Sequence, residues 1–219
     1  MKKISFIVFA LSIGLVTFAQ NENVTPMAVK TRFGIKAGVN LAKLRPSDFA
    51  TNEPHTNFKS TFNAGAFVNV PLGTGGFAVQ PEAMYSRQGS KMKITTTVGT
   101  VTTSNSIEQD LGYVNVPVML QWKSKGGFYV ETGPQVGFLI AAQQEGPGTN
   151  AETENKEDFE SVDFAWGTGV GYLSRIGLGI GGRYNHGFKN VLDNEGDNNP
   201  SLRNSVVNIG LTWHFGAGK

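Results

Sequence analysis

The sequence predicts an all-β fold, an eight-stranded antiparallel up-and-down barrel. Apolar residues alternate with small or polar residues in eight separate segments, and this period of two is typical of β-strands with one apolar face. Short connections alternate with long ones along the chain, as expected for a barrel with tight turns at one end and long loops at the other. A chain of 219 residues is long enough for one such domain.

The first 19 residues form a separate segment. Lys2 and Lys3 give a basic start, residues 4–16 are apolar, and Thr17-Phe18-Ala19 is a small-x-small cleavage site. This pattern is typical of a cleaved secretory signal peptide, and the apolar run is too short to span a membrane as a helix. We therefore expect a signal peptide at residues 1–19, a short lead at 20–30, the barrel domain at 31–215 and a C-terminal tail at 216–219.

The charge balance and the absence of cysteine exclude several classes of function. The chain has 19 Lys and Arg against 17 Asp and Glu, and two of the lysines belong to the signal peptide, so 17 of each sign remain. Such a balance gives no indication of nucleic-acid binding. The absence of cysteine excludes disulfides, thiol catalysis and cysteine-based zinc sites.

The strands follow one another with regular punctuation. We expect them at residues 32–42, 61–72, 77–98, 111–122, 128–140, 162–172, 176–185 and 204–215. Tight turns are predicted at 73–76, 123–127 and 174–175, and long loops at 43–59, 143–160 and 189–203. Between the third and fourth strands, a Thr-rich hairpin returns through residues 101–107 and is polar on both sides, so we expect it to stand in water.

Three prolines lie inside these strands, at Pro81, Pro117 and Pro134. A proline lacks the N–H that a central strand position donates, so we expect a bulge at each. A bulge can reverse the in/out assignment on one side of it.

The bulk of the apolar face indicates that it points outward. Nearly every strand carries Phe, Trp or Tyr on that face, and an eight-stranded interior has little room for such side chains. The charged strand residues all fall on the opposite face, and we expect them to form a lumen network: Lys36, Glu82, Glu131, Asp163 and Arg183. A lipid-facing Lys or Arg would cost roughly 2–4 kcal/mol at the membrane midplane. A barrel in a membrane is therefore favoured over a soluble, ligand-binding barrel.

Aromatic residues near the strand ends are predicted to form two girdles at the membrane surfaces. The girdle toward the short turns would contain Trp122, Phe128, Tyr172, Trp213 and Phe215. The girdle toward the long loops would contain Phe62, Tyr85, Phe138, Phe164 and Tyr184.

Five sequence motifs are distinctive: YVNVPVMLQW from Tyr113, GFYVETGPQVGFLI from Gly127, GVGY from Gly169, GLGIGGRYNHGF from Gly177 and the terminal NIGLTWHF. Together they resemble the PorT-like outer-membrane β-barrel family of Gram-negative bacteria. The resemblance implies an eight-stranded barrel in the outer membrane, whereas the secretion role behind the family name does not transfer on fold alone. Outer-membrane proteins usually end on an aromatic residue that the barrel-assembly machinery reads. Trp213 and Phe215 are the expected signal here, although four residues follow.

Other motifs admit functional and structural interpretations. Gly177–Gly182 matches G-x-G-x-x-G but lies on a strand with no helical pattern after it, so we interpret it as a slim lumen face. The cluster Asp193, Glu195, Asp197, Asn198 and Asn199 lacks EF-hand spacing and is interpreted as a loop tip. The three histidines, at 55, 186 and 214, are far apart in sequence, and there is no G-x-S-x-G motif.

These observations predict an outer-membrane barrel that is not an enzyme, binds no cofactor, metal or nucleic acid, and is monomeric. Its expected partners are outer-membrane lipid, the assembly machinery during biogenesis, and a protein that binds the extracellular loops. The main hypothesis is a structural or surface-interaction role, with the hairpin at Ile94–Thr103 as a candidate for β-augmentation. The alternatives are a narrow pore for water, ions or small solutes, and an accessory component of a secretion or envelope complex. The lumen charges would then be either a plug or the lining of the pore.

Overall fold

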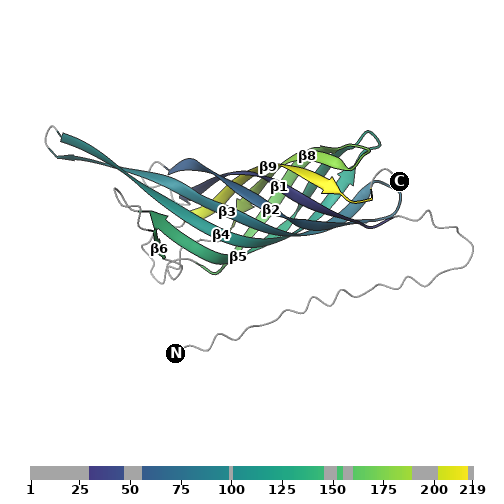
Figure 1. The fold of residues 1–219 in the computed structure, drawn as a ribbon, viewed down its shortest axis with the longest axis horizontal. Helices are drawn as coiled ribbons and strands as arrows, with labels where there is room; N and C mark the ends of the chain where they lie inside the picture. The colour runs from purple at the N-terminus through teal and green to yellow at the C-terminus, as the bar shows by residue number, and fades with distance from the viewer. Residues whose placement is uncertain are drawn as a thin grey trace, which may run out of the picture.

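The computed structural model describes residues 30–46, 56–98, 101–145, 152–154, 160–188 and 202–216. Within these residues the chain forms nine β-strands (Figure 1). Their bounds are β1 Arg32–Pro46, β2 Thr56–Pro71, β3 Phe77–Val98, β4 Val101–Lys123, β5 Phe128–Glu145, β6 Glu152–Glu154, β7 Val162–Leu173, β8 Leu178–Gly187 and β9 Leu202–His214. No helix in the described part of the chain is long and apolar enough to cross a membrane.

Eight of the strands close into an antiparallel barrel. Each pairs with its neighbours in the order β4-β3-β2-β1-β9-β8-β7-β5, and pairing of β4 with β5 completes the ring. The first and last strands are joined along their length, from Gly34–His214 to Pro46–Leu202. The predicted fold is therefore confirmed. The short strand β6, which pairs only with the end of β5, was not predicted, because it lies in the acidic loop without an alternating pattern.

The apolar faces point outward, as predicted. Exposed fractions exceed 40% for the large apolar residues along β1 and β9, among them Phe33, Ile35, Val39, Ile209 and Leu211. The intervening residues of these and the other strands are mostly buried, and they are largely Asn, Gln, Gly and charged residues. The lumen is therefore a polar core, with an apolar cluster of Leu111, Tyr113, Leu139 and Ala142 toward the long-loop end.

The predicted bulges at the prolines are wrong. Near Pro81 the β2–β3 ladder is interrupted between Phe67–Glu82 and Val70–Val79, but the register on the two sides is the same. Pro117 and Pro134 interrupt the pairing of their strands in the same way without shifting it. A proline removes a hydrogen-bond donor but inserts no residue, so the pairs on either side hold the register.

The register shifts lie elsewhere. One is in the β2–β3 ladder between Phe58 and Asn63, and the other is in the β4–β5 ladder between Gly112 and Tyr113. Both are nearer the long-loop end than the prolines are. The inward and outward positions predicted for the strands therefore hold across all three prolines.

Two of the tight turns share one geometry. In residues 124–127 and 174–177, a Ser begins the turn and a Gly with φ above 90° ends it. The N–H groups of Gly127 and Gly177 each donate to the carbonyl of that Ser at 3.1 Å. A side chain would be strained at these backbone angles, which explains the glycine. These turns and the one at 72–76 define the short-turn end of the barrel.

The hairpin of β3 and β4 extends beyond the rest of the barrel at the opposite, long-loop end (Figure 1). Its ladder keeps one register from Phe77–Trp122 to Val98–Val101 and is interrupted only beside Pro117. Pairing of β2 with β3 reaches only Met92, and pairing of β5 with β4 reaches only Glu108. The predicted projecting hairpin is therefore present in the backbone. Its side chains lie outside the described residues.

Candidate functional site in the barrel lumen

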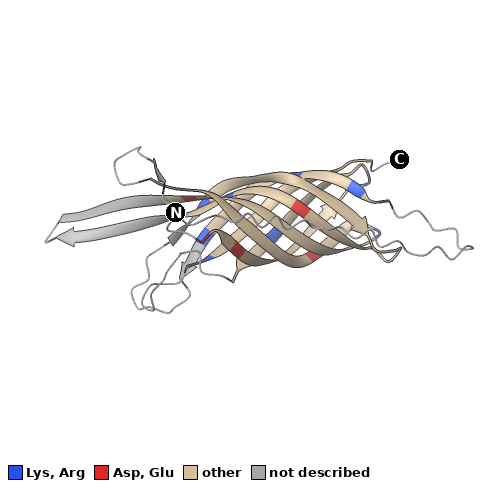
Figure 2. Cartoon of the chain, turned by 90° about the horizontal axis from the view of Figure 1, so that it is seen from below, with Lys and Arg blue, Asp and Glu red and all other residues tan. Residues whose placement is uncertain are grey.

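Four charged residues form one layer across the middle of the lumen. Lys36 on β1, Glu82 on β3, Glu131 on β5 and Arg183 on β8 come from alternate strands of the eight-stranded ring. In such a ring, β1 lies opposite β5 and β3 lies opposite β8. Each opposite pair therefore joins a cation to an anion, and the layer has no net charge. Figure 2 shows acidic and basic positions along the barrel wall.

Arg183 is the centre of this layer. Its two Nη atoms donate to the two oxygens of Glu82 at 2.7 and 2.8 Å, and its Nε donates to Glu131 Oε1 at 2.7 Å. Lys36 Nζ lies 3.7 Å from Glu82 Oε1 and 4.0 Å from Glu131 Oε1. Paired, hydrogen-bonded charges of this kind can be buried at acceptable cost, whereas an unpaired one cannot.

Amide side chains extend the layer toward the short-turn end. Gln80 Nε2 donates to Glu82 at 2.9 Å, and Gln121 Nε2 donates to Glu131 at 3.3 Å. The amide of Asn69 then donates to both glutamines, at 3.0 and 3.2 Å. The two carboxylates are thus linked by a hydrogen-bond network whose side chains come from four neighbouring strands, β2, β3, β4 and β5.

The fifth predicted member of the network, Asp163, is placed elsewhere. It lies on β7, opposite Gly137 of β5, and accepts a hydrogen bond from Asn204 at 3.0 Å. The sequence correctly assigned it to the polar face of its strand. Its height in the barrel depends on strand stagger, which the alternating pattern does not contain.

The structure contains a second charged cluster near the long-loop end, which the sequence pattern did not predict. Lys59 Nζ lies 2.7 Å from Asp110 Oδ2, and Arg87 Nη2 lies 3.5 Å from the same oxygen. Lys59 was assigned to a loop, and Asp110 precedes the predicted fourth strand. Both strands are longer than predicted at this end, which brings the two side chains into the barrel.

Asn40 is the centre of a third network between these two clusters. It is fully buried, and its amide donates to Ser86 Oγ at 2.9 Å and to the carbonyl of Arg87 at 2.8 Å. Its oxygen accepts hydrogen bonds from Asn63 and Asn208. Asparagines recur at inward positions of several strands, which was the available sequence signal for this network.

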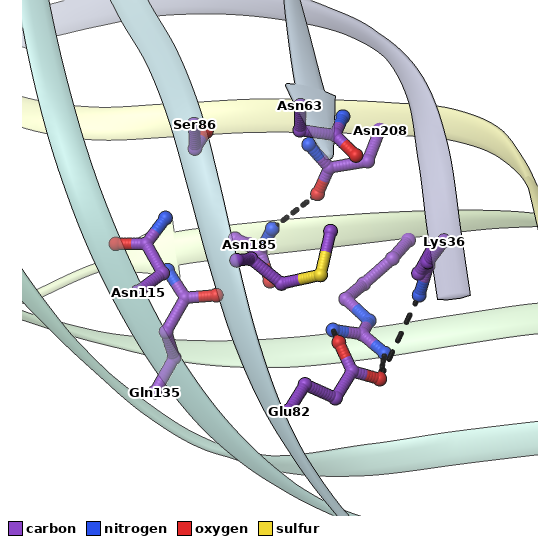
Figure 3. Close-up of a pocket in the computed structure, with 10 residues that line it drawn as sticks. Lys36, Asn63, Glu82, Ser86, Asn115, Gln135, Asn185 and Asn208 are labelled. Carbon is purple, nitrogen blue, oxygen red and sulfur yellow. Dashed lines mark hydrogen bonds and ion pairs between the residues drawn. The ribbon is translucent and has the colours of Figure 1, made fainter. Parts of the chain in front are cut away.

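Little space is left between the charged layer and these asparagines. The cavity there has a volume of about 20 Å³ and is bounded by residues that include Lys36, Asn63, Glu82, Asn185 and Asn208 (Figure 3). A volume of this size holds about one water molecule. In the described structure, the lumen at this level is filled with side chains.

Glycines make room for bulky side chains in the lumen. A Cβ added to Gly181 would lie 2.4 Å from the hydroxyl oxygen of Tyr129, and one added to Gly34 would lie 2.2 Å from Phe67 Cζ. Gly181 belongs to the G-x-G-x-x-G match, and the match continues directly into strand β8 instead of a helix. These glycines therefore leave space for aromatic rings inside the barrel. This agrees with the interpretation of Gly177–Gly182 as a slim lumen face.

The predicted girdle residues lie at the outer surface, with one exception. At the short-turn end, Phe128 and Tyr172 contact each other with ring centres 5.1 Å apart, and at the other end Phe62 and Tyr85 do so at 5.7 Å. The exposed predicted members are Phe62, Tyr85, Trp122, Phe128, Phe138, Phe164, Tyr172, Trp213 and Phe215. Tyr184 is half-buried, and its hydroxyl lies 3.1 Å from Ser205 Oγ.

The remaining predicted clusters do not converge on a site in the described chain. His186 pairs with Ser205 toward the long-loop end, whereas the N–H of His214 donates to Gly177 at the short-turn end. His55 and the acidic cluster at residues 193–199 lie outside the described residues. Among the described residues, no three His, Cys, Asp or Glu side chains are grouped to hold a metal ion.

A closed barrel with an apolar exterior and a polar, filled lumen defines an integral outer-membrane β-barrel protein. A family model described as "Outer membrane protein beta-barrel domain" matches residues 18–193, and the chain belongs to this family. It is therefore a protein of the outer membrane. No curated protein sequence matches the chain.

Three solved structures are similar in fold. Neisserial surface protein A (NspA) is 10% identical with a TM-score of 0.50, and the match covers 83% of this chain and 96% of NspA. Ail, the attachment invasion locus protein of Yersinia pestis, is 13% identical with a TM-score of 0.44, over 85% and 99% of the two chains. OprG of Pseudomonas aeruginosa is 11% identical with a TM-score of 0.39, over 84% and 95%. At these identities the likeness concerns the fold alone.

Proposed function

We propose that this protein is a non-enzymatic outer-membrane scaffold that presents an interaction surface at its long-loop end. The observation that carries the proposal is the filled lumen. Arg183, Glu82 and Glu131 are each at most 5% exposed, and Arg183 donates hydrogen bonds to both carboxylates across the barrel. Such a neutral, paired layer suits a plug that fills the lumen and holds strand register better than it suits a conducting pathway.

The hairpin of β3 and β4 is the proposed interaction element. Beyond Met92 on β3 and before Glu108 on β4, no strand in the described chain pairs with its outer edges. Free strand edges offer backbone N–H and C=O groups to a partner strand, which is the basis of β-augmentation. The expected partner is a protein with an extended segment that can pair with one of these edges.

Single-channel recording tests the filled lumen. The mature protein would be refolded, shown to be folded by its heat-dependent gel mobility, and inserted into a planar bilayer. The proposal predicts no discrete conductance steps, and Arg183→Gln would then open a pathway by breaking the layer. Steps from the unaltered protein, changed in size by Glu131→Gln, would instead establish the alternative of a narrow pore.

Photo-crosslinking in living cells tests the hairpin. A photoreactive amino acid at Thr97 should give a crosslinked product, whereas the same group at Thr74, in the short turn at the other end, should not give that product. Excision of Thr95–Ser104, with the strands rejoined by Asn-Gly, removes Thr97 but preserves the pairing of Ile94 with Asn105. A photoreactive group at Lys93, which the excision keeps, should therefore give the product in the full-length hairpin and lose it after the excision. If a photoreactive group in another long loop still gives the same crosslinked product after the excision, the hairpin is not the element that binds the partner.

The finer assignment to the PorT-like group, and with it an accessory role in secretion, rests on the five motifs quoted above. Loss of the gene would then reduce the amount of exported proteins at the cell surface. If secretion is unchanged while the crosslinked product at Thr97 is present, the surface-interaction role is supported instead.

A further inference from the structure

A basic cleft lies at the short-turn end, outside the lumen network. It has a volume of about 320 Å³ and is lined by Arg32, Lys123, Lys125 and Arg175, together with Ser124 and Ser174. Arg32 and Lys123 are half-buried, and Lys125 and Arg175 are exposed at the tips of their turns. The cleft is thus open to solvent on one side and has cations at different depths.

Three separate parts of the chain build this cleft. Residues 124–127 and 174–177 are turns of the same geometry, and each has a cation at its second position. The N–H of Leu173 donates to the carbonyl of Gly127 at 2.8 Å, which fixes the two turns side by side. Arg32 comes from the start of β1, which lies opposite β5 in the ring. The convergence is therefore a product of barrel closure.

The charge of the cleft is uncompensated within the described chain. None of its four cations forms an ion pair with a described carboxylate, in contrast to Lys59 and Arg183, whose partners lie at 2.7 Å. The described segments at this end, residues 30–35, 70–79, 121–130, 172–180 and 211–216, contain no Asp or Glu. In Figure 2 the red positions accordingly lie further along the barrel. Like charges held this close repel one another unless an anion joins them.

We propose that this cleft binds a phosphate group. Two guanidinium and two ammonium groups, with the Ser124 hydroxyl beside them, are donors that recognise phosphate oxygens. The Ser174 hydroxyl already donates to the carbonyl of Leu178 at 2.6 Å. Tyr172, a member of the predicted aromatic girdle, also lines the cleft, so we expect the cleft to lie at the membrane surface. The phosphate could therefore come from a lipid headgroup in the adjacent leaflet or from a soluble phosphate compound. This inference does not depend on the proposed function of the hairpin.

The test uses folded mature protein in maltoside micelles, which contain no phosphate. Short-chain phosphatidylglycerol and inorganic phosphate would be titrated separately at constant ionic strength, with calorimetry and the NMR amide signals of Gly126 and Gly127 as readouts. The variant Lys125→Gln/Arg175→Gln should weaken binding at least roughly tenfold. Because both side chains are exposed, the variant should keep the heat-dependent gel mobility of the folded protein.

The matched control is Lys30→Gln/Arg203→Gln, which removes the same charge from exposed positions that do not line the cleft. It should bind like the unaltered protein. Binding of phosphatidylglycerol alone would assign the site to a lipid headgroup, and binding of both probes would assign it to phosphate itself. The proposal would be overturned if neither probe binds, or if the control variant weakens binding as much as the cleft variant.

Discussion

Arg183 and Glu82 join opposite walls of the barrel through two parallel hydrogen bonds of 2.7 and 2.8 Å. They are 101 residues apart in sequence, on strands β8 and β3, which are four strands apart in either direction around the ring. Such a bidentate pair is directional as well as attractive, so it specifies which strand faces which. The same pair therefore holds opposite strands together and occupies the lumen between them.

Removing one charge from this pair should destabilise the barrel. We expect Glu82→Gln to lower the free energy of unfolding by about 3 kcal/mol, because Arg183 keeps its charge in a buried site with one carboxylate fewer. Urea unfolding in lipid vesicles, followed by tryptophan fluorescence, measures the effect. The double variant Glu82→Gln/Arg183→Met should recover part of the loss. A single variant as stable as the unaltered protein would show that water compensates the missing carboxylate.

The contact of Gly181 with Tyr129 predicts a specific steric effect. Gly181→Ala should lower the stability by about 1–3 kcal/mol, because the new Cβ would lie 2.4 Å from the tyrosine hydroxyl oxygen. Adding Tyr129→Phe should restore much of it by removing that oxygen. The neighbouring Gly182→Ala is the control, since its Cβ would meet no atom closer than 3.7 Å. Equal losses in the two glycine variants would refute the steric explanation.

The outward face predicts a cost that depends on depth in the membrane. Ile209→Arg should make folding into vesicles less favourable by roughly 2–4 kcal/mol, because Ile209 is 54% exposed on the lipid-facing side of β9. Leu72→Arg, next to a short turn and 52% exposed, should cost about 1 kcal/mol or less. Folded fractions from gel mobility across a urea series give both values. A larger loss at Leu72 would contradict the assigned outward face and depth.

The terminal aromatic residues predict an effect on assembly in cells. Phe215 is half-exposed, and its N–H donates to the carbonyl of Phe33 at the seam between the first and last strands. Phe215→Ala should reduce the amount of folded protein in the outer membrane several-fold, whereas removal of residues 216–219 should not. Immunoblots of unheated membrane fractions provide the measurement. If only the removal of the tail impairs assembly, the assembly signal lies beyond Phe215.

The alternating pattern determined which residues face the lipid and which face the lumen. That assignment holds for the described strand side chains between Phe33 and Phe215, apart from the half-buried Tyr184, because successive strand side chains point to opposite faces whatever the partners are. The same pattern located the three tight turns, since short polar or Gly-rich breaks interrupt it. It also predicted the projecting hairpin, whose polar residues continue the third and fourth strands beyond the apolar band.

Only the tertiary structure decided which lumen residues meet. Lys36, Glu82, Glu131 and Arg183 form one layer, and Asp163 does not join it, because barrel closure and strand stagger set the height of each inward position. The wrongly predicted bulges have a related cause: a proline removes a hydrogen bond, but the pairs on both sides of the strand hold its register. The basic cleft likewise depends on closure, which brings Arg32 to the two turns. Alternation is a property of one strand, whereas contact across a barrel is a property of all eight.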